Sequence, residues 1–291
     1  IDCQDYENRR GFEIVSGEDE NTIIDGFRIY NCRSDQYGGN IYIEDSSPAF
    51  KNCKIESGYS RYKGDGVAIR GNSNPTFDNI NFYNNGGNWE NSASHNRGGA
   101  AYIDSEADAT FNDCEFWYNG QSNYYNGGAI YLDNNSNDVE FNDCYFYQNG
   151  RPDGEGTDGG AIYATNSRLT INDSEFEYNR TDEYGGAMYL NGSTHCTISG
   201  SYFHRNGYST NRGGAIFNDS SDTLIIRDTK IVGNGWDWDY QNTGNSYNSN
   251  YNNLEYGGGI YISNNGYTLI DNSEITRNRT YNSSSRGMGI F

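Results

Sequence analysis

A two-part repeat runs along the whole chain of 291 residues and restricts the folds that the chain can adopt. Its first part is Gly-Gly followed by a small, an aliphatic and an aromatic residue. Close copies of this part lie at 38–42, 98–102, 127–131, 159–163, 185–189, 213–217 and 257–261. The second part follows eight to ten residues later, as at 111–119, and closes on Asn. Its fourth position falls at 3, 27, 53, 80, 114, 144, 174, 201, 229 and 273. Ten copies about 30 residues apart on average indicate a repeat architecture.

Short alternating apolar runs within each copy predict strands. Val139 and Phe141, or Ile130 and Leu132, recur with a period of two, which is typical of a strand and not of a helix. A repeat this short cannot bury its own apolar face, so successive copies must stack on one another. Strands of neighbouring copies then pair in parallel, about 4.8 Å apart. The sequence therefore predicts an all-β fold, a single parallel β-helix of about ten coils over 1–291. The crossover preference of parallel strands makes it right-handed.

Two polar columns of the repeat are interpreted as structural. The third position of the second part is Asp, Asn or Gly in all ten copies, from Asp2 to Asn272. These residue types tolerate positive φ at a tight bend, so the column favours turn chemistry over a catalytic or metal-binding row. The ninth position is Asn in eight of the ten copies. Stacked amides can hydrogen-bond along such a column, so we expect a ladder of asparagines.

The paired motifs resemble a known family of surface proteins. Gly-Gly-Ala-Ile, together with Phe-x-x-Asn at 116–119, 146–149 and 176–179, is similar to the paired repeat of the chlamydial polymorphic outer-membrane proteins. More broadly, the chain resembles the secreted right-handed β-helix proteins. The resemblance covers essentially the whole chain, and it implies an adhesive or surface-displayed stalk.

Charge and composition argue against several classes of partner. The chain carries 40 acidic and 20 basic side chains, and its net charge of −20 would repel nucleic-acid phosphates and anionic lipid surfaces. No stretch approaches the roughly 18 apolar residues that a membrane span requires. The 27 tyrosines are not typical of a disordered chain. We therefore expect a folded protein with no nucleic-acid partner and no membrane span, located outside the cell or at its surface.

Insertions between the closing Asn and the next Gly-Gly offer candidate binding loops. The longest are 86–97 and 235–256, and all of them enter at one corner of the predicted coil. Insertions on one face of a repeat protein often form its binding surface. Exposed aromatic rings beside Asn and Asp suit stacking on sugars or docking of a neighbouring subunit, and rings folded back over the flank are the alternative. The candidate binding residues are Trp89, Trp236, Trp238, Tyr240, Tyr247 and Tyr251.

The aromatic position of the Gly-Gly motif forms a second candidate surface. If Ile130 and Leu132 point inward, Tyr131 points outward by the alternation of a strand. The equivalent positions would then form a continuous aromatic stripe, which serves either cross-strand stacking or a ligand track. These positions are Tyr42, Tyr102, Tyr131, Tyr163, Tyr189, Phe217, Tyr261 and Phe291.

The six cysteines do not have the spacing of a zinc site or of a small disulfide scaffold. Cys3, Cys53, Cys114 and Cys144 share the fourth column of the repeat. Cys114 and Cys144 fall in adjacent coils within disulfide reach, so they are the candidate disulfide, with two buried free thiols as the alternative. The composition is typical of an extracellular protein, and its sequons give candidate glycosylation sites at Asn134, Asn191, Asn218 and Asn282.

No set of residues with the spacing of an enzyme site emerges from the sequence. The histidines His95, His195 and His204 are scattered, and acidic pairs such as Asp182 and Glu183 fall in turns. We therefore predict no catalytic residue, no metal site and no cofactor, apart from weak Ca²⁺ binding by loop carboxylates.

These observations favour a non-catalytic extracellular β-helix that serves as the structural subunit of a surface filament or adhesin. Because the chain begins and ends within the repeat, we expect it to be part of a longer chain or to associate head to tail into a filament. The alternative function is a carbohydrate-binding or polysaccharide-cleaving module, of the lyase or hydrolase type, that uses the loop tryptophans. Glycans are accordingly candidate ligands.

Overall fold

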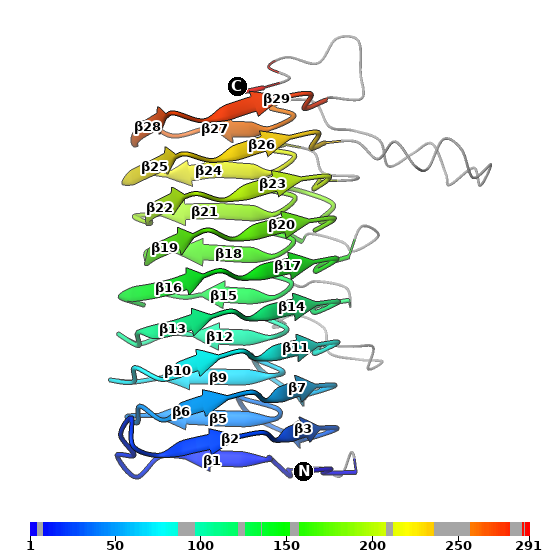
Figure 1. The fold of residues 1–291 in the computed structure, drawn as a ribbon, viewed down its shortest axis with the longest axis vertical. Helices are drawn as coiled ribbons and strands as arrows, with labels where there is room; N and C mark the ends of the chain where they lie inside the picture. The colour runs from blue at the N-terminus through cyan, green and yellow to red at the C-terminus, as the bar shows by residue number, and fades with distance from the viewer. Residues whose placement is uncertain are drawn as a thin grey trace, which may run out of the picture.

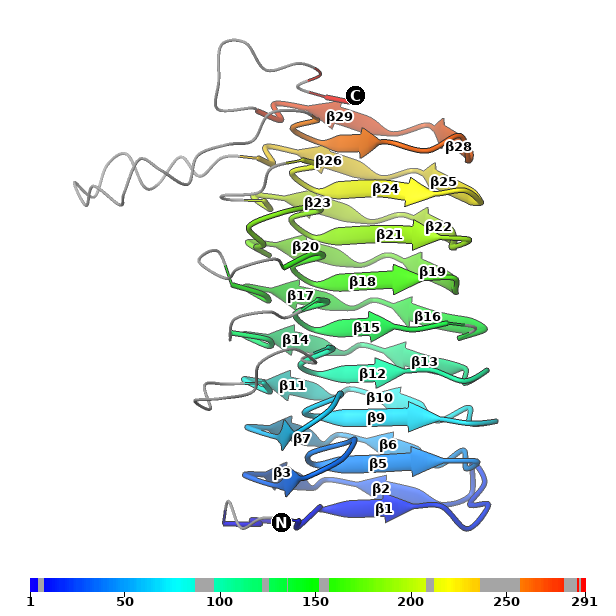
Figure 2. The same cartoon turned by 180° about the vertical axis from the view of Figure 1, so that it is seen from behind.

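The computed structural model is a column of stacked coils, each of which runs through three short strands (Figure 1). The N- and C-terminal residues lie at opposite ends of this column (Figure 2). Strands of successive coils pair in parallel into three nine-stranded sheets, and the described residues contain no helix. The predicted all-β parallel solenoid is therefore confirmed. The structure describes residues 1–4, 8–86, 97–121, 126–134, 136–151, 157–207, 212–235, 257–279, 287 and 289–291.

Each main sheet takes one strand from every coil. Sheet 1 consists of β1 (Phe12–Ile14), β5 (Ile41–Glu44), β9 (Val67–Arg70), β12 (Ala101–Ile103), β15 (Ile130–Leu132), β18 (Ile162–Thr165), β21 (Met188–Gly192), β24 (Ile216–Ser220) and β27 (Ile260–Ile262). Sheet 2 consists of β2 (Ile23–Asp25), β6 (Ala49–Lys51), β10 (Thr76–Asp78), β13 (Ala109–Asn112), β16 (Asp138–Asn142), β19 (Arg168–Asn172), β22 (His195–Ser199), β25 (Thr223–Arg227) and β28 (Tyr267–Asp271). Sheet 3 consists of β3 (Arg28–Tyr30), β7 (Lys54–Glu56), β11 (Asn81–Tyr83), β14 (Glu115–Trp117), β17 (Tyr145–Tyr147), β20 (Glu175–Glu177), β23 (Tyr202–His204), β26 (Lys230–Val232) and β29 (Glu274–Thr276). A separate two-stranded sheet pairs β4 (Arg33–Ser34) with β8 (Tyr59–Ser60).

The first copy of the repeat does not form a full coil. Sheets 2 and 3 have nine strands and not ten, because this copy contributes only an isolated bridge between Asp2 and Tyr30. The bridge aligns Asp2 with Tyr30, whereas the repeat alignment placed it with Gly26. Cys3 therefore lies outside the fourth column, which corrects the predicted register of this copy. The sequence alignment of this copy relied on residue types alone. The backbone pairs Asp2 with a residue four positions further along the chain than Gly26.

The predicted turn column is confirmed in the nine other copies. All nine residues have positive φ, between 45° and 76°, a conformation that Asp, Asn and Gly tolerate best. Asp2 is not among the residues with positive φ, and its carboxylate accepts a hydrogen bond of 2.9 Å from the N–H of Gln4. The confirmed positions are Gly26, Asn52, Asn79, Asp113, Asp143, Asp173, Gly200, Asp228 and Asn272.

Two files of stacked phenylalanine rings fill the interior of the coils. The file from sheet 2 has centroids 4.8 to 5.2 Å apart, and the file from sheet 3 has centroids 4.4 to 4.8 Å apart. All of these rings are fully buried. Like side chains therefore stack in register, as the repeat predicted. The two files are Phe50, Phe77, Phe111 and Phe141 from sheet 2, and Phe82, Phe116, Phe146, Phe176 and Phe203 from sheet 3.

A ladder of buried asparagines follows the strands of sheet 3 and confirms the second polar column. Each Nδ2 donates to the Oδ1 of the next asparagine at 2.9 to 3.1 Å, up to the last member. Asn40, which the repeat did not place in this column, donates to Asn85 Oδ1 at 3.1 Å and begins the ladder. Asn8, a predicted member, instead hydrogen-bonds Asp35 at the exposed surface. The other members are Asn85, Asn119, Asn149, Asn179, Asn206, Asn234 and Asn278.

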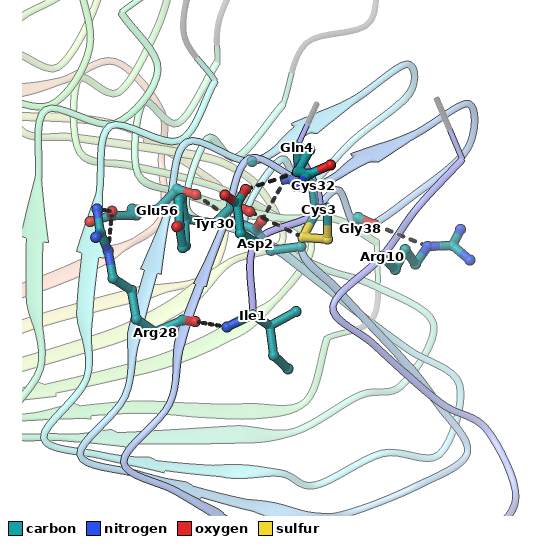
Figure 3. Close-up of a disulfide and its surroundings, with 12 residues drawn as sticks. Ile1, Asp2, Cys3, Gln4, Arg10, Arg28, Tyr30, Cys32, Gly38 and Glu56 are labelled. Atoms are coloured by element: carbon teal, nitrogen blue, oxygen red, sulfur yellow. Dashed lines mark hydrogen bonds and ion pairs between the residues drawn. A yellow bond between two sulfur atoms is a disulfide. The ribbon is translucent and has the colours of Figure 1, made fainter. Parts of the chain in front are cut away.

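One disulfide joins Cys3 to Cys32, with the two Cα atoms 4.8 Å apart (Figure 3). The predicted disulfide between Cys114 and Cys144 is wrong, because both are buried free thiols. Each of these two Sγ atoms donates to a backbone carbonyl of the preceding coil, at 3.3 and 3.4 Å. Burial raises the pKa of Cys114 well above its ordinary value. A buried thiol that stays protonated is a structural side chain and not a nucleophile.

Candidate functional site

The outward-facing rings of sheet 1 form a continuous file along the column, as strand alternation predicted. Successive rings from Tyr131 to Phe291 have centroids 4.7 to 5.2 Å apart. Most of these rings are nevertheless buried, and Tyr102 exposes 1% and Tyr189 8% of its surface. The file is therefore a second apolar cluster held by cross-strand stacking. Burial excludes the alternative of an open ligand track over the buried rings.

Tyr37 closes a gap in this aromatic file. Ala68 occupies the file position between Tyr42 and Tyr102, where it leaves room for a ring. The Tyr37 ring packs against Tyr102 with centroids 5.8 Å apart, and the Arg70 guanidinium lies 4.3 Å from the centroid of Tyr37. Such a cation–π contact stabilises a partly desolvated arginine. Tyr37 stands outside the periodic positions, so the repeat gave no signal for this role.

A network of polar side chains lies beside Tyr102 and connects three successive coils. Lys63 Nζ donates to the Tyr102 hydroxyl at 2.8 Å and to Asp133 Oδ2 at 2.9 Å. The Tyr102 hydroxyl also lies 2.8 Å from Asp133 Oδ2 and 2.9 Å from Asp104 Oδ2. Arg70 Nε donates to Asp104 Oδ1 at 2.9 Å. Each carboxylate thus has a basic partner, and the phenol bridges the two carboxylates.

The protonation states of this network suit a structural clamp. Burial, together with the charges of Asp104 and Asp133, raises the pKa of Tyr102 far above its ordinary value, so the phenol remains a donor. Burial would raise the pKa of Asp133, but hydrogen bonds from Lys63 and Tyr102 lower it below its ordinary value. Neither the phenol nor the Asp133 carboxylate is therefore poised to exchange a proton near neutral pH, as general acid–base catalysis requires.

A different acidic group, Asp158, has a pKa close to neutral pH. Burial raises the pKa of Asp158 to about 7, with a further contribution from the charge of Glu183. The Asp158 Oδ1 atom has no hydrogen-bond partner among the described residues. The pKa of Glu183 is raised as well, by burial and by Asp182. The 182–183 pair, which the sequence places in a turn, is therefore partly buried.

A cluster of one histidine and two glutamates lies on the outer face of sheet 3; we call Glu175, Glu177 and His204 the His–Glu cluster. Both glutamates come from β20, where Phe176 points inward between them, and His204 on β23 is the register partner of Glu177. His204 Nε2 lies 2.7 Å from Glu175 Oε1, and Nδ1 lies 3.7 Å from Glu177 Oε1. One nitrogen or oxygen atom from each of the three side chains lies within 4.8 Å of the other two.

Neighbouring side chains hold the His–Glu cluster in place. The Tyr145 hydroxyl on β17 donates to Glu177 Oε2 at 2.6 Å. Burial and this carboxylate raise the pKa of Tyr145 well above its ordinary value, so the phenol remains a donor. The Tyr202 ring stacks on the imidazole of His204, with centroids 4.3 Å apart. Arg205 adds a charged contact, with Nη1 3.2 Å from Glu177 Oε1.

Sequence reasoning missed the His–Glu cluster because it treated the three histidines one by one. The signal was present in the repeat. Stepping back by one copy from His204 leads to Glu177, and the same step from Tyr202 leads to Glu175. Outward positions of adjacent coils are neighbours in space, so a column-by-column comparison of polar residues would have found the group.

The candidate glycosylation sites differ in exposure. Asn134 is exposed, and Asn191 is half-buried, with Nδ2 3.2 Å from the Tyr163 hydroxyl. Asn218 is buried, and its Oδ1 accepts the N–H of Ser220 at 3.1 Å. A glycan does not fit on a buried amide of the folded chain, so the prediction for Asn218 is wrong; a sequon carries no information on burial.

The candidate binding residues of the insertions, and one candidate glycosylation site, lie outside the described residues. Their roles in sugar binding, docking or glycan attachment stay predictions. They are Trp89, Trp236, Trp238, Tyr240, Tyr247, Tyr251 and Asn282.

The geometry defines a parallel β-solenoid of three sheets. Its turn column, phenylalanine files, asparagine ladder and aromatic file all stabilise the fold. A family model described as the right-handed β-helix region matches residues 11–203, and the chain belongs to this family. The match confirms the right-handed β-helix and does not extend to the narrower chlamydial repeat. No curated protein and no solved structure matches the chain. Among the described residues, no helix is long and apolar enough to cross a membrane.

Proposed function

We propose that this right-handed β-helix is a non-catalytic structural subunit of an extracellular surface filament or adhesin. The observation that carries the proposal is the continuity of its columns. Stacked phenylalanines, the asparagine ladder and the three parallel sheets run from coil to coil without a change of register. In such a one-dimensional stack each coil contacts only its neighbours, and the product is an extended rod suited to a structural role.

Exposed apolar side chains at the two ends of the column support head-to-tail association. Ile23, on β2, exposes 56% of its surface, and Tyr267, on β28, exposes 61%. β2 and β28 are the outer strands of sheet 2. An outer strand with unpaired backbone groups is a template for pairing with another chain. Contact between two unlike ends does not close into a ring and extends into a filament.

Light scattering and electron microscopy of the 291-residue chain test this proposal. We expect unbranched end-to-end particles with masses that are multiples of the monomer mass. Ile23→Lys adds a charge at the exposed end and should shift the particles to monomers. Tyr62→Lys is the matched control, because it adds the same charge at an exposed side chain, with 45% of its surface accessible, away from the outer strands of the three main sheets.

Two results would contradict the head-to-tail arrangement. One is a chain that stays monomeric at every concentration. The other is an equal loss of assembly in both variants, which would place the interface on the flank of the column. Sugar binding that disappears in Trp236→Ala while assembly is unchanged would favour the alternative function as a carbohydrate-binding module.

A further inference from the structure

We propose that the His–Glu cluster on sheet 3 is a binding site for a divalent transition-metal ion, with Zn²⁺ as the ion that fits best. The sequence predicted no metal site, and the structural role proposed above does not require one. The proposal rests on three observations: the donor atoms that converge, the supports that fix them, and the charge that they carry.

The donor atoms match the ligand preferences of zinc. Zn²⁺ binds imidazole nitrogen and carboxylate oxygen, with bonds of about 2.0–2.2 Å. Ligand atoms around a tetrahedral ion are then about 3.4 Å apart. The three donor atoms of the cluster already lie within 4.8 Å of one another. Glu175 is the most exposed of the three side chains, at 46%, and can rotate to close the remaining difference without a change in the backbone.

A nitrogen donor also separates the proposed ion from calcium and magnesium. Those hard cations take oxygen ligands, whereas imidazole suits zinc and its transition-metal neighbours. Glu175, Glu177 and His204 would supply three protein ligands, which leaves a fourth position on the exposed side for water. Because the two glutamates lie beside different ring nitrogens, the ion binds His204 Nδ1, which is 3.7 Å from Glu177 Oε1, and Glu175 rotates away from its hydrogen bond with Nε2 to become the third ligand.

Residues around the His–Glu cluster hold its three side chains in position. β20 and β23 fix the three Cα positions through parallel pairing, and Tyr202 stacks on the imidazole. The Tyr145 hydroxyl holds Glu177 Oε2 and leaves Oε1 on the side of His204. Partners that hydrogen-bond a ligating carboxylate orient it, and their loss typically lowers metal affinity by about 10–100-fold.

The charge of the cluster favours a cation. Two carboxylates lie beside the imidazole, and Arg205 offsets only one of these charges, through Glu177. The Arg205 side chain is 53% exposed, so it can move aside when an ion reaches Glu177. A divalent ion therefore replaces like-charge repulsion between the two glutamates with attraction.

His195 offers a matched control within the same chain. It lies on β22 with Nδ1 3.7 Å from the carboxylate of Asp222, so it has one acidic neighbour where His204 has two. A single histidine and one carboxylate do not make a three-ligand site. His195→Gln therefore removes a partly exposed histidine without touching the His–Glu cluster.

Calorimetric titration of the untagged 291-residue chain with ZnCl₂ tests the proposal. We expect one equivalent of Zn²⁺ that is lost in His204→Gln and in Glu175→Gln, and retained in His195→Gln. Tyr145→Phe should weaken this equivalent by about 10–100-fold, because it removes only the support of Glu177. Co²⁺ in place of Zn²⁺ should give the visible absorption of a tetrahedral nitrogen–oxygen site, absent in His204→Gln.

Circular dichroism establishes whether each variant is folded. His204→Gln and Glu175→Gln change different strands, so if one of these variants does not fold, the other still tests the proposal. Binding that is unchanged in His204→Gln or Glu175→Gln would overturn the proposal. Loss of the equivalent in His195→Gln would place the ion elsewhere, and Ca²⁺ that competes as well as Zn²⁺ would refute the assignment to a transition metal.

Discussion

An Asn149→Ala chain should lose about 4 kcal/mol in its free energy of unfolding and melt about 10 °C below the parent chain. Asn149 Nδ2 donates to the carbonyl of Phe116 at 2.7 Å and to Asn179 Oδ1 at 3.0 Å. Its Oδ1 accepts from the backbone N–H and from the side-chain amide of Asn119, both at 3.0 Å. Alanine removes these partners from the buried Phe116 carbonyl and Asn119 N–H, and each such group costs about 1–3 kcal/mol.

Asn142→Ala is the control for this prediction. Asn142 belongs to an outward file in which Nδ2 donates to Asn112 Oδ1 at 3.0 Å and Oδ1 accepts from Asn172 at 2.9 Å. These amides are partly exposed, so water can replace the lost hydrogen bonds and the cost should stay within about 1 kcal/mol. Urea denaturation of both variants, followed by circular dichroism, measures the difference. Equal losses would mean that the inner ladder has no special role in stability.

Phe82→Ala should cost about 3–5 kcal/mol, the range for removal of a buried aromatic side chain. Phe82 is fully buried, and its ring stacks on Phe116 with centroids 4.8 Å apart and an interplanar angle of 2°. It also packs against Phe77 and Phe111 of the other file. Alanine leaves a cavity that the stacked neighbours cannot fill, because the sheets on either side fix their positions.

Tyr83→Ala is the control, since it removes a ring of similar size from the opposite face of the same strand. Tyr83 is exposed, and its ring contacts are with Tyr118 and Lys54 at the surface. Its loss should cost about 1 kcal/mol or less. Thermal and urea unfolding of the two variants should therefore differ by at least a factor of three in lost stability. A Tyr83→Ala chain as unstable as Phe82→Ala would show that the strand faces are assigned the wrong way round.

Much of the fold could be predicted because the repeat places like residues one coil apart. The residues of the turn column have positive φ, and few residue types accept this conformation. The presence of Asp113 or Asn79 at this position of the repeat therefore predicts its backbone conformation. The asparagine ladder is equally direct, because a buried amide such as Asn149 must find partners and the nearest are the same residue in the next coil. Both predictions depend on periodicity alone and hold wherever the period is regular.

Predictions failed where the chain leaves the period. Cys3 shares a residue type with Cys53 and Cys114, but the spacing after the first copy shifts its register, and its partner is Cys32. Asn40 enters the ladder from the Gly-Gly segment, where no asparagine was expected. Where the period is irregular, the neighbours of a residue depend on the length of the local loop. The type of the residue carries no information on that length.

The candidate sites, too, divide into features that follow from the period of the repeat and features that do not. Stacking of the aromatic file followed from its period, but its burial did not, because Tyr37 and Tyr184, which pack against it, stand outside the file positions of the repeat. The His–Glu cluster follows from the period once outward positions are compared between coils. Among outward positions, only the aromatic ones of the Gly-Gly motif were compared between copies, and for that reason His204 and its two glutamates on sheet 3 were missed.

The central claim is that successive coils stack in register at strand spacing, and distances along one outward column of sheet 3 test it most directly. Lys54, Asn81, Glu115 and Glu274 belong to this column, with Glu274 seven, six and five strands away from the other three. Pulsed electron–electron spin resonance on chains with nitroxide labels at Glu274 and at each of the others in turn gives the three distances. The native free thiols are buried, so the parent chain should take up no label.

At about 4.8 Å per strand, the stacked-coil account predicts label separations near 34, 29 and 24 Å. The step should be constant although the sequence separation between neighbouring strands varies, with 27 residues between Lys54 and Asn81 and 34 between Asn81 and Glu115. Distances that grow with the number of intervening residues, or that do not change by one strand spacing per coil, would contradict the account.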